Sequence, residues 1–192
     1  MGVELTERYA KALEWICEIH ATQRRKMHQD PYVGHLLRVG GMVLEWAESE
    51  DEAIAALLHD AAEDCGGQEM LDAIASKLGA TVAEYVLGCS DSLVGDPSSK
   101  APWKERKLHH IARAKTAPLA VRRIMLCDKI DNARSILAER RILGNAIFEK
   151  FQGGKEILWY FQQMFEVLSD GTPRQLSDEL QRIVKELSCE TF

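Results

Sequence analysis

A short segment gathers ionisable side chains directly behind an apolar run. Residues 53–58 are apolar, and His59, Asp60, Glu63 and Asp64 follow at once. On one continuous helix, His59 and Asp60 would lie about 100° apart, with Glu63 and Asp64 one turn further on. Burying these groups uncompensated would be very costly, and acids at a helix C-terminus oppose the macrodipole. A divalent cation would resolve both problems, although a satisfied core histidine beside a solvated helix end stays possible.

Two distant segments carry side chains of the same kind. His35 follows a break at Pro31, and Asp128 interrupts an apolar helical pattern, with Asn132 one turn later. Alone, each would more often be structural. Together, two histidines and two aspartates make a nitrogen and oxygen donor set that suits Mn²⁺, Fe²⁺ or Zn²⁺, with open positions for water or phosphate. The predicted metal ligands are therefore His35, His59, Asp60 and Asp128.

The elements that must position these residues are helices. Apolar residues recur at three- and four-residue steps, and no alternating strand pattern of any length occurs. Residues 91–102 form the longest irregular piece. The sequence predicts an all-α protein in a single domain over residues 1–192, with its core at about 5–188. The expected helices cover about 4–20, 34–48, 51–64, 68–78, 81–90, 103–115, 118–139, 155–169 and 173–188.

Composition excludes several classes of protein. The 192 residues carry 24 basic and 30 acidic side chains, and this net charge of −6 argues against a broad nucleic-acid surface. No apolar run is long enough to cross a membrane, and the N-terminus lacks the pattern of a secretory signal. The five cysteines are widely spaced without a CxxC pair, so we expect reduced thiols and a cytoplasmic location.

The surroundings of the candidate ligands resemble a known family. The pattern H…HD…D is the signature of the HD phosphohydrolase superfamily, and its longer form is similar to the hydrolase domain of RelA/SpoT proteins. In size the chain resembles the small alarmone hydrolases, which include the metazoan SpoT homologue. The resemblance extends over about residues 8–185. The motifs that carry it are Pro31-Tyr32-x-x-His35, His59-Asp60-x-x-Glu63-Asp64 and Asp128-Lys129-x-x-Asn132-x-Arg134.

This resemblance implies roles for the motif residues. It implies an HD-domain helical bundle in which the four predicted ligands hold a metal ion, usually Mn²⁺, with Glu63 and Asp64 beside the attacking water. It also implies substrate contacts at Arg25, Lys26, Asn132, Ser135, Lys155 and Tyr160.

Structural alternatives for several of these residues stay open. Residues 24–26 could be only a basic helix end that complements the dipole. Tyr160 could be a core residue, and Arg134 is better explained as a structural ion-pair partner. Glu156, next to Lys155, stands where a basic residue is expected in the family.

The implied reaction is metal-dependent removal of the 3′-pyrophosphate from (p)ppGpp-type nucleotides. The loop before Pro31 is shorter than in the family and lacks glycine, which makes (p)ppApp an alternative substrate. No segment resembles the synthetase, TGS or ACT parts of long RelA/SpoT proteins. A nucleoside 5′-monophosphatase and a non-catalytic nucleotide sensor are the rival hypotheses. We expect a small nucleotide as partner, no membrane, and no nucleic acid except a modified tRNA end.

Overall fold

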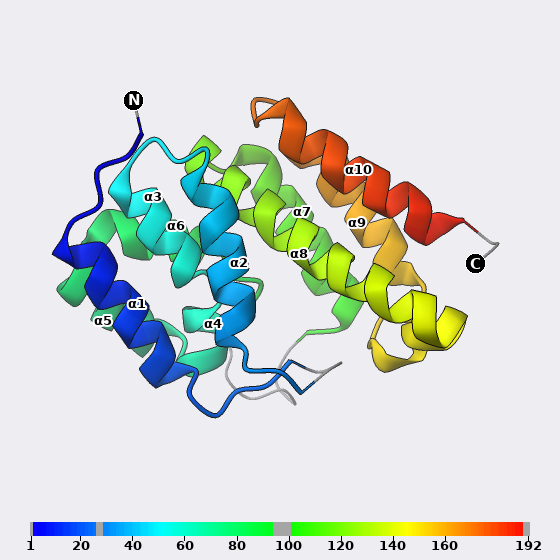
Figure 1. Cartoon of the computed structure of the whole chain (residues 1–192), viewed down its shortest axis with the longest axis horizontal. Helices are drawn as coiled ribbons and strands as arrows, with labels where there is room; N and C mark the ends of the chain where they lie inside the picture. Colours follow the sequence, from blue (N-terminus) through cyan, green and yellow to red (C-terminus); the bar gives the residue numbers. More distant parts are fainter. Residues whose placement is uncertain (1, 26–28, 94–100, 190–192) are drawn as a thin grey trace. The chain divides into compact units, whose positions relative to one another are not determined.

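The computed structural model describes residues 2–25, 29–93 and 101–189. In these ranges the chain is helical apart from turns, loops and an isolated bridge between Arg24 and Pro31, which confirms the predicted all-α class (Figure 1). The α-helices are α1 (Glu7–Ile19), α2 (Val33–Leu44), α3 (Glu50–Leu57), α4 (Ala61–Cys65), α5 (Gln68–Leu78), α6 (Ala80–Cys89), α7 (Trp103–Thr116), α8 (Leu119–Leu143), α9 (Glu156–Leu168) and α10 (Arg174–Ser188).

The chain divides into two compact units, Met1–Ala101 and Pro102–Phe192. Helices α1 to α6 belong to the first unit, and α7 to α10 belong to the second. The single domain expected over residues 1–192 stays a prediction.

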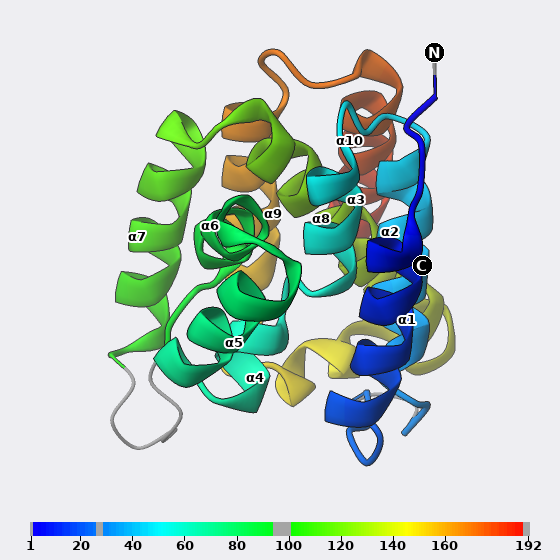
Figure 2. The same cartoon turned by 90° about the vertical axis from the view of Figure 1, so that its left-hand side faces the viewer.

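Helix α3 is the centre of the first unit. It packs against α1, α2 and α6, and residues 53–57 are fully buried or nearly so (Figure 2). Its N-terminus is fixed twice. The Ser49 hydroxyl accepts a hydrogen bond from the backbone N–H of Glu52 at 3.2 Å, and Arg8 of α1 pairs with Glu50 at 3.1 Å and Asp51 at 2.6 Å. The position where α3 begins is therefore fixed by a cap and by two ion pairs.

The expectation of one helix over residues 51–64 is wrong. Helix α3 ends at Leu57, residues 58–60 form a turn, and α4 begins at Ala61. In a continuous helix the backbone N–H of Asp60 would bond to the carbonyl of Ala56. Here Nδ1 of His59 lies 2.8 Å from that carbonyl oxygen, so the side chain uses the acceptor that the helix would need.

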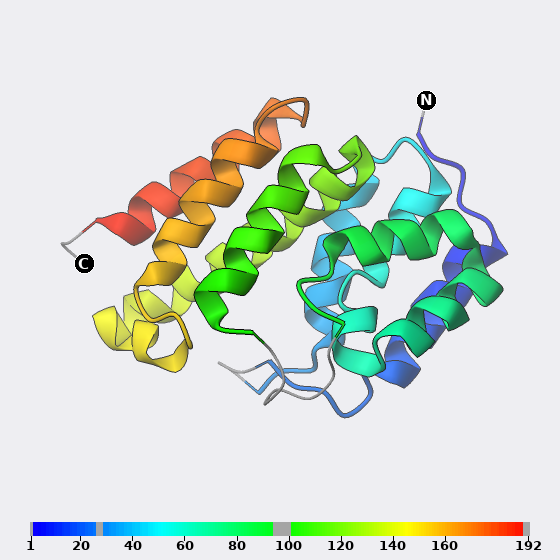
Figure 3. The ribbon, with the colours of Figure 1, turned by 180° about the vertical axis from the view of Figure 1, so that it is seen from behind.

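The second unit is organised around α8, which is buried over most of its length. Helices α9 and α10 pack beside it, and α7 packs beside α9 (Figure 3). Arg140 joins α8 to the end of α10 by donating to the carbonyls of Leu187 at 2.6 Å and Cys189 at 2.8 Å. Helix α8 extends to Leu143 rather than to about 139, and a 3-10 helix follows at Gly144–Lys150, where no element was expected.

Two composition-based expectations are addressed by the structure. Within the described ranges, no helix combines the length and apolarity needed to cross a membrane. All five cysteines lie among the described residues, and none forms a disulfide.

Candidate metal centre

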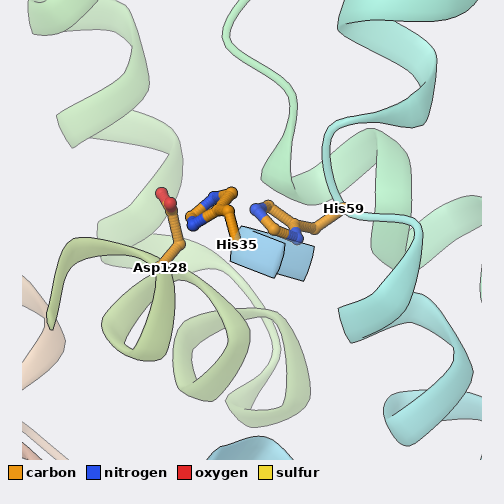
Figure 4. Close-up of side chains that lie close together, drawn as sticks. All are labelled: His35, His59 and Asp128. Carbon is orange, nitrogen blue, oxygen red and sulfur yellow. The ribbon is translucent and has the colours of Figure 1, made fainter. Parts of the chain in front are cut away.

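Three predicted ligands of the first unit converge on one point. His35 on α2 and His59 in the turn after α3 are buried, with exposed fractions of 1% and 3%. Oδ2 of Asp60 lies 3.1 Å from Nε2 of His59 and 3.5 Å from Nε2 of His35. The two imidazole rings meet edge to face with centroids 5.2 Å apart (Figure 4). Two ring nitrogens and a carboxylate oxygen thus face the same small volume.

The broken helix produces this convergence. Side chains of adjacent residues on a continuous helix diverge by about 100°, whereas the turn at residues 58–60 directs His59 and Asp60 to the same place. It also selects the tautomer of His59. The carbonyl of Ala56 can only accept, so Nδ1 of His59 carries the proton and Nε2 presents a lone pair. That arrangement is typical of a metal-binding histidine.

Tyr32 fixes the third donor. Its hydroxyl donates a hydrogen bond to Oδ2 of Asp60 at 2.6 Å. Its ring also packs edge-on against His35, with centroids 5.5 Å apart. A hydrogen-bonded carboxylate beside two oriented imidazoles resembles the way outer groups hold the ligands of known metal sites. Tyr32 therefore restrains both Asp60 and His35.

The predicted catalytic acids lie on α4. Glu63 accepts a hydrogen bond from the backbone N–H of Asp91 at 3.2 Å. Asp64 borders solvent and accepts one from Nε2 of Gln23 at 2.7 Å. Partial removal from water, with the charge of Asp60 adding to it, raises the pKa of Asp64 above its usual range, although the bond from Gln23 opposes the shift. A carboxyl with a raised pKa is a stronger proton acceptor once it is ionised.

The fourth predicted ligand, Asp128, belongs to the second unit. It projects from α8 and is buried at 8% exposure (Figure 4). Lys129 and Asn132 both donate to its carboxylate, so Asn132 is one turn away as the spacing predicted. The ion pair with Lys129 and the bond from Asn132 compensate for the burial of this charge. Its role as a ligand stays a prediction.

The predicted substrate residues have varied surroundings. Arg25 is half-buried, with its guanidinium carbon 5.6 Å from the centroid of the Tyr32 ring. Lys26 lies outside the described residues. Ser135 donates to the backbone carbonyl of Asp131 at 3.0 Å, and Lys155 is exposed just before α9. None of these contacts tests a role in binding.

Tyr160 and Arg134 have clear structural partners. Tyr160 is buried, and its hydroxyl lies 2.6 Å from Nδ1 of His110. The ammonium groups of Lys107 and Lys129 lie 4.9 and 5.6 Å from the centre of its ring. Arg134 pairs with Glu179 at 2.6 Å, which confirms its interpretation as an ion-pair partner. A contact of Tyr160 with ribose stays a prediction.

Sequence reasoning missed three residues around this site. Tyr32 was noted only as a member of the first motif, and neither His20 nor Gln23 was singled out. His20 and Gln23 are three residues apart and bond to each other. That spacing at a helix end is too common to identify a functional pair. For Tyr32, its position three residues before His35 was the available signal.

Comparison with known proteins identifies the class. A family model described as an HD domain matches residues 12–149, so the chain belongs to the HD-domain family. It is 31% identical over 139 residues to the guanosine-3′,5′-bis(diphosphate) 3′-pyrophosphohydrolase MESH1 of Drosophila melanogaster, a match that covers 71% of this chain and 73% of the relative. The chain is thus a small HD-domain hydrolase related to that protein.

Other relatives agree. The chain is 29% identical over 130 residues to a guanosine-3′,5′-bis(diphosphate) 3′-pyrophosphohydrolase of Aquifex aeolicus (strain VF5), covering 68% of this chain but 18% of that protein. A solved metazoan ortholog of SpoT, described as hydrolysing ppGpp, superimposes with a TM-score of 0.76 at 24% identity over 96% of this chain and 98% of the other. A solved protein of Listeria monocytogenes EGD-e superimposes with a TM-score of 0.67 at 26% identity, over 80% of this chain and 97% of the other. The metazoan structure supports the fold.

Proposed function

We propose that this protein is a metal-dependent hydrolase that removes the 3′-pyrophosphate from (p)ppGpp-type nucleotides. The observation that carries the proposal is the convergence of His35, His59 and Asp60, because no packing role requires two buried imidazole nitrogens to face one carboxylate oxygen. Membership of the HD-domain family and the names of the relatives supply the reaction class.

We propose Mn²⁺ as the ion, held by His35, His59, Asp60 and Asp128. Two neutral imidazole nitrogens and two carboxylate oxygens form a donor set that suits Mn²⁺ and its neighbours better than Ca²⁺ or Mg²⁺, which prefer oxygen alone. Such an ion, when bound, increases the acidity of water and offsets negative charge on phosphoryl oxygens. In this account, Tyr32 keeps Asp60 oriented and the Ala56 carbonyl keeps Nε2 of His59 available.

Glu63 and Asp64 are proposed to handle the attacking water. Both carboxylates are held by hydrogen bonds, from the Asp91 backbone and from the Gln23 side chain. A restrained carboxylate can orient a water molecule and accept its proton as the new bond to phosphorus forms. The bond from phosphorus to the 3′ oxygen would break in the same step, so that pyrophosphate leaves and the 3′ oxygen takes up a proton.

Substrate recognition is proposed to involve positive and polar side chains. Arg25 and Lys26 would contact the base and phosphates, because a guanidinium plane can stack on a purine. Asn132, Ser135 and Lys155 would bind phosphate, and Tyr160 would lie near the ribose. We propose that the substrate range includes (p)ppApp, and that the enzyme acts in the cytoplasm, which agrees with cysteines that form no disulfides.

The test compares the products released from ppGpp, ppApp and AMP in the presence of Mn²⁺. We expect pyrophosphate from ppGpp, from ppApp, or from both, and no orthophosphate from AMP. Orthophosphate from AMP alone would replace this proposal with a 5′-monophosphatase. Tight nucleotide binding without any product would instead indicate a sensor. A tRNA with a pyrophosphorylated end, added to the same assay, tests whether the enzyme can act as an antitoxin.

A further inference from the structure

His20 contacts two residues, Gln23 and Tyr32, and each of them bonds to a carboxylate of the candidate centre. It is the residue after α1 and is 1% exposed. Its Nδ1 lies 2.5 Å from Oε1 of Gln23, and its ring stacks on that of Tyr32 with centroids 5.5 Å apart and planes at 24°. The sulfur of Cys65 lies 3.8 and 3.9 Å from the two ring nitrogens. All of these residues belong to the first unit.

The hydrogen bonds that connect His20, Gln23 and Asp64 have a fixed direction. An ionised carboxylate only accepts, so the amide nitrogen of Gln23 must face Asp64, to which it donates at 2.7 Å. The amide oxygen then faces His20, and because it too only accepts, Nδ1 of His20 must carry a proton. The bonds to Asp64 and from His20 both require this one amide orientation, so His20 supports the orientation in which Gln23 restrains the carboxylate of Asp64.

The contact between His20 and Tyr32 is ring packing. The Tyr32 ring stacks on His20, and its hydroxyl donates to Oδ2 of Asp60 at 2.6 Å. The same buried imidazole therefore supports a proposed ligand through one neighbour and a proposed water-handling carboxylate through another. Partners of this kind fix the orientation of groups that hold a metal or react.

We propose that His20 and Gln23 are positioning residues for hydrolysis, with Gln23 acting through Asp64; this inference rests on the proposed function. Neither residue touches the reacting atoms. Gln23 holds Asp64 in the orientation that water activation needs, and His20 holds Gln23 in the only amide orientation that can donate to Asp64.

The direct test is Gln23→Glu, which keeps the shape of the side chain and removes the donor. We expect kcat for pyrophosphate release to fall about 10- to 100-fold, with KM, Mn²⁺ affinity and the melting temperature little changed. The matched control is Gln68→Glu on α5, whose amide also donates to an aspartate, Asp72, at 2.9 Å, but on the exposed surface. Equal kcat values for both variants would overturn the proposal.

A double-mutant cycle tests whether Gln23 acts through Asp64. In an Asp64→Asn background, Gln23→Glu should change kcat by less than about twofold, because the restrained carboxylate is already absent. Additive losses would mean that Gln23 acts elsewhere, for example on the substrate, and would overturn the mechanism. If the wild type releases no pyrophosphate, the proposed function fails, and only the next experiment bears on the inference.

A measurement without metal or substrate tests the hydrogen-bonded chain itself. In ¹⁵N-resolved NMR spectra, the side-chain amide signal of Gln23, assigned by its loss in Gln23→Glu, should shift in both Asp64→Asn and His20→Leu. His20→Asn, whose amide can replace the Nδ1 donor, should restore the signal and more than half of the kcat lost in His20→Leu. An amide signal that is unchanged in Asp64→Asn would contradict the hydrogen-bonded chain from His20 through Gln23 to Asp64.

Discussion

The turn at residues 58–60 and the middle of α8 present acidic side chains in opposite ways. In the turn, the neighbours His59 and Asp60 point to the same place, with Nε2 and Oδ2 3.1 Å apart. On α8 the helix is uninterrupted, and Asp128 receives bonds from Lys129, through that residue's long stem, and from Asn132 one turn away. The turn thus brings two potential ligands from adjacent positions close together. The uninterrupted helix presents one potential ligand together with the residues that donate hydrogen bonds to it.

This difference explains how the adjacent side chains of His59 and Asp60 can approach the same point. On a regular helix, these two side chains would diverge by about 100°. The turn costs α3 the backbone bond to the Ala56 carbonyl, and the imidazole of His59 replaces it. Four substitutions test whether the turn and the residues that hold it in place have these roles.

Removing a donor from the turn should have the largest effect. His59→Ala should abolish pyrophosphate release and reduce bound Mn²⁺, because it removes a proposed ligand as well as the side chain that bonds to the Ala56 carbonyl in the turn. Metal content and turnover are measured together. The control is His109→Ala, which alters an exposed histidine on α7 and should behave like wild type. Full metal content in His59→Ala would contradict the assignment.

Neutralising the water-handling acid should rank second. Asp64→Asn should lower kcat by about 100-fold or more, since general-base assistance is lost, while Mn²⁺ binding persists. Asp72→Asn is the matched control, because Asp72 also accepts from a glutamine amide but lies on the exposed face of α5. Kinetics and metal titration are run on both proteins. A rate equal to that of wild type would remove Asp64 from the mechanism.

Loss of one support should have a moderate effect. Tyr32→Phe removes the hydroxyl that donates to Asp60 and keeps the ring stacked on His20. We expect Mn²⁺ affinity to weaken about tenfold, as measured by calorimetry. Tyr85→Phe on α6 provides the control, because it removes the same hydroxyl from a half-buried tyrosine that is not part of the candidate centre. Identical affinities in both variants would mean that Asp60 does not depend on Tyr32.

The smallest effect concerns the packing that ends α3. A Cβ at Gly40 would meet Cδ2 of Leu57, the last residue of α3, at 2.6 Å, whereas one at Gly41 would meet nothing within 4 Å. Gly40→Ala should lower the free energy of unfolding by about 1 kcal/mol through overpacking. Gly41→Ala should raise it by about 0.5 kcal/mol, because alanine favours a helix. Denaturant unfolding compares them; equal stabilities would refute the close packing.

The sequence predicted the helical class because three-residue and four-residue apolar spacing marks buried helix faces. Motif spacing named His35, His59, Asp60 and Asp128 as candidate ligands, and the first three converge within the first unit. The break at residues 58–60 was not predictable in this way. The side chain of His59 bonds to the carbonyl of Ala56 at this break, and no glycine or proline marks it in the sequence.

The supporting residues escaped prediction for a similar reason. Gln23 and Asp64 are 41 positions apart, and Tyr32 and Asp60 are 28 apart. Only the packing of α1, α3 and α4 brings such pairs together, and single-sequence patterns carry no signal for it. His110 is likewise buried and bonds to Tyr160, 50 positions away, a pairing that local patterns do not predict.

The most direct test of the central claim is a crystal of this protein grown with Mn²⁺ and measured near the manganese absorption edge. We expect one strong anomalous peak within coordination distance of His35, His59, Asp60 and Asp128. A peak at other residues, or no peak at saturating Mn²⁺, would contradict the account.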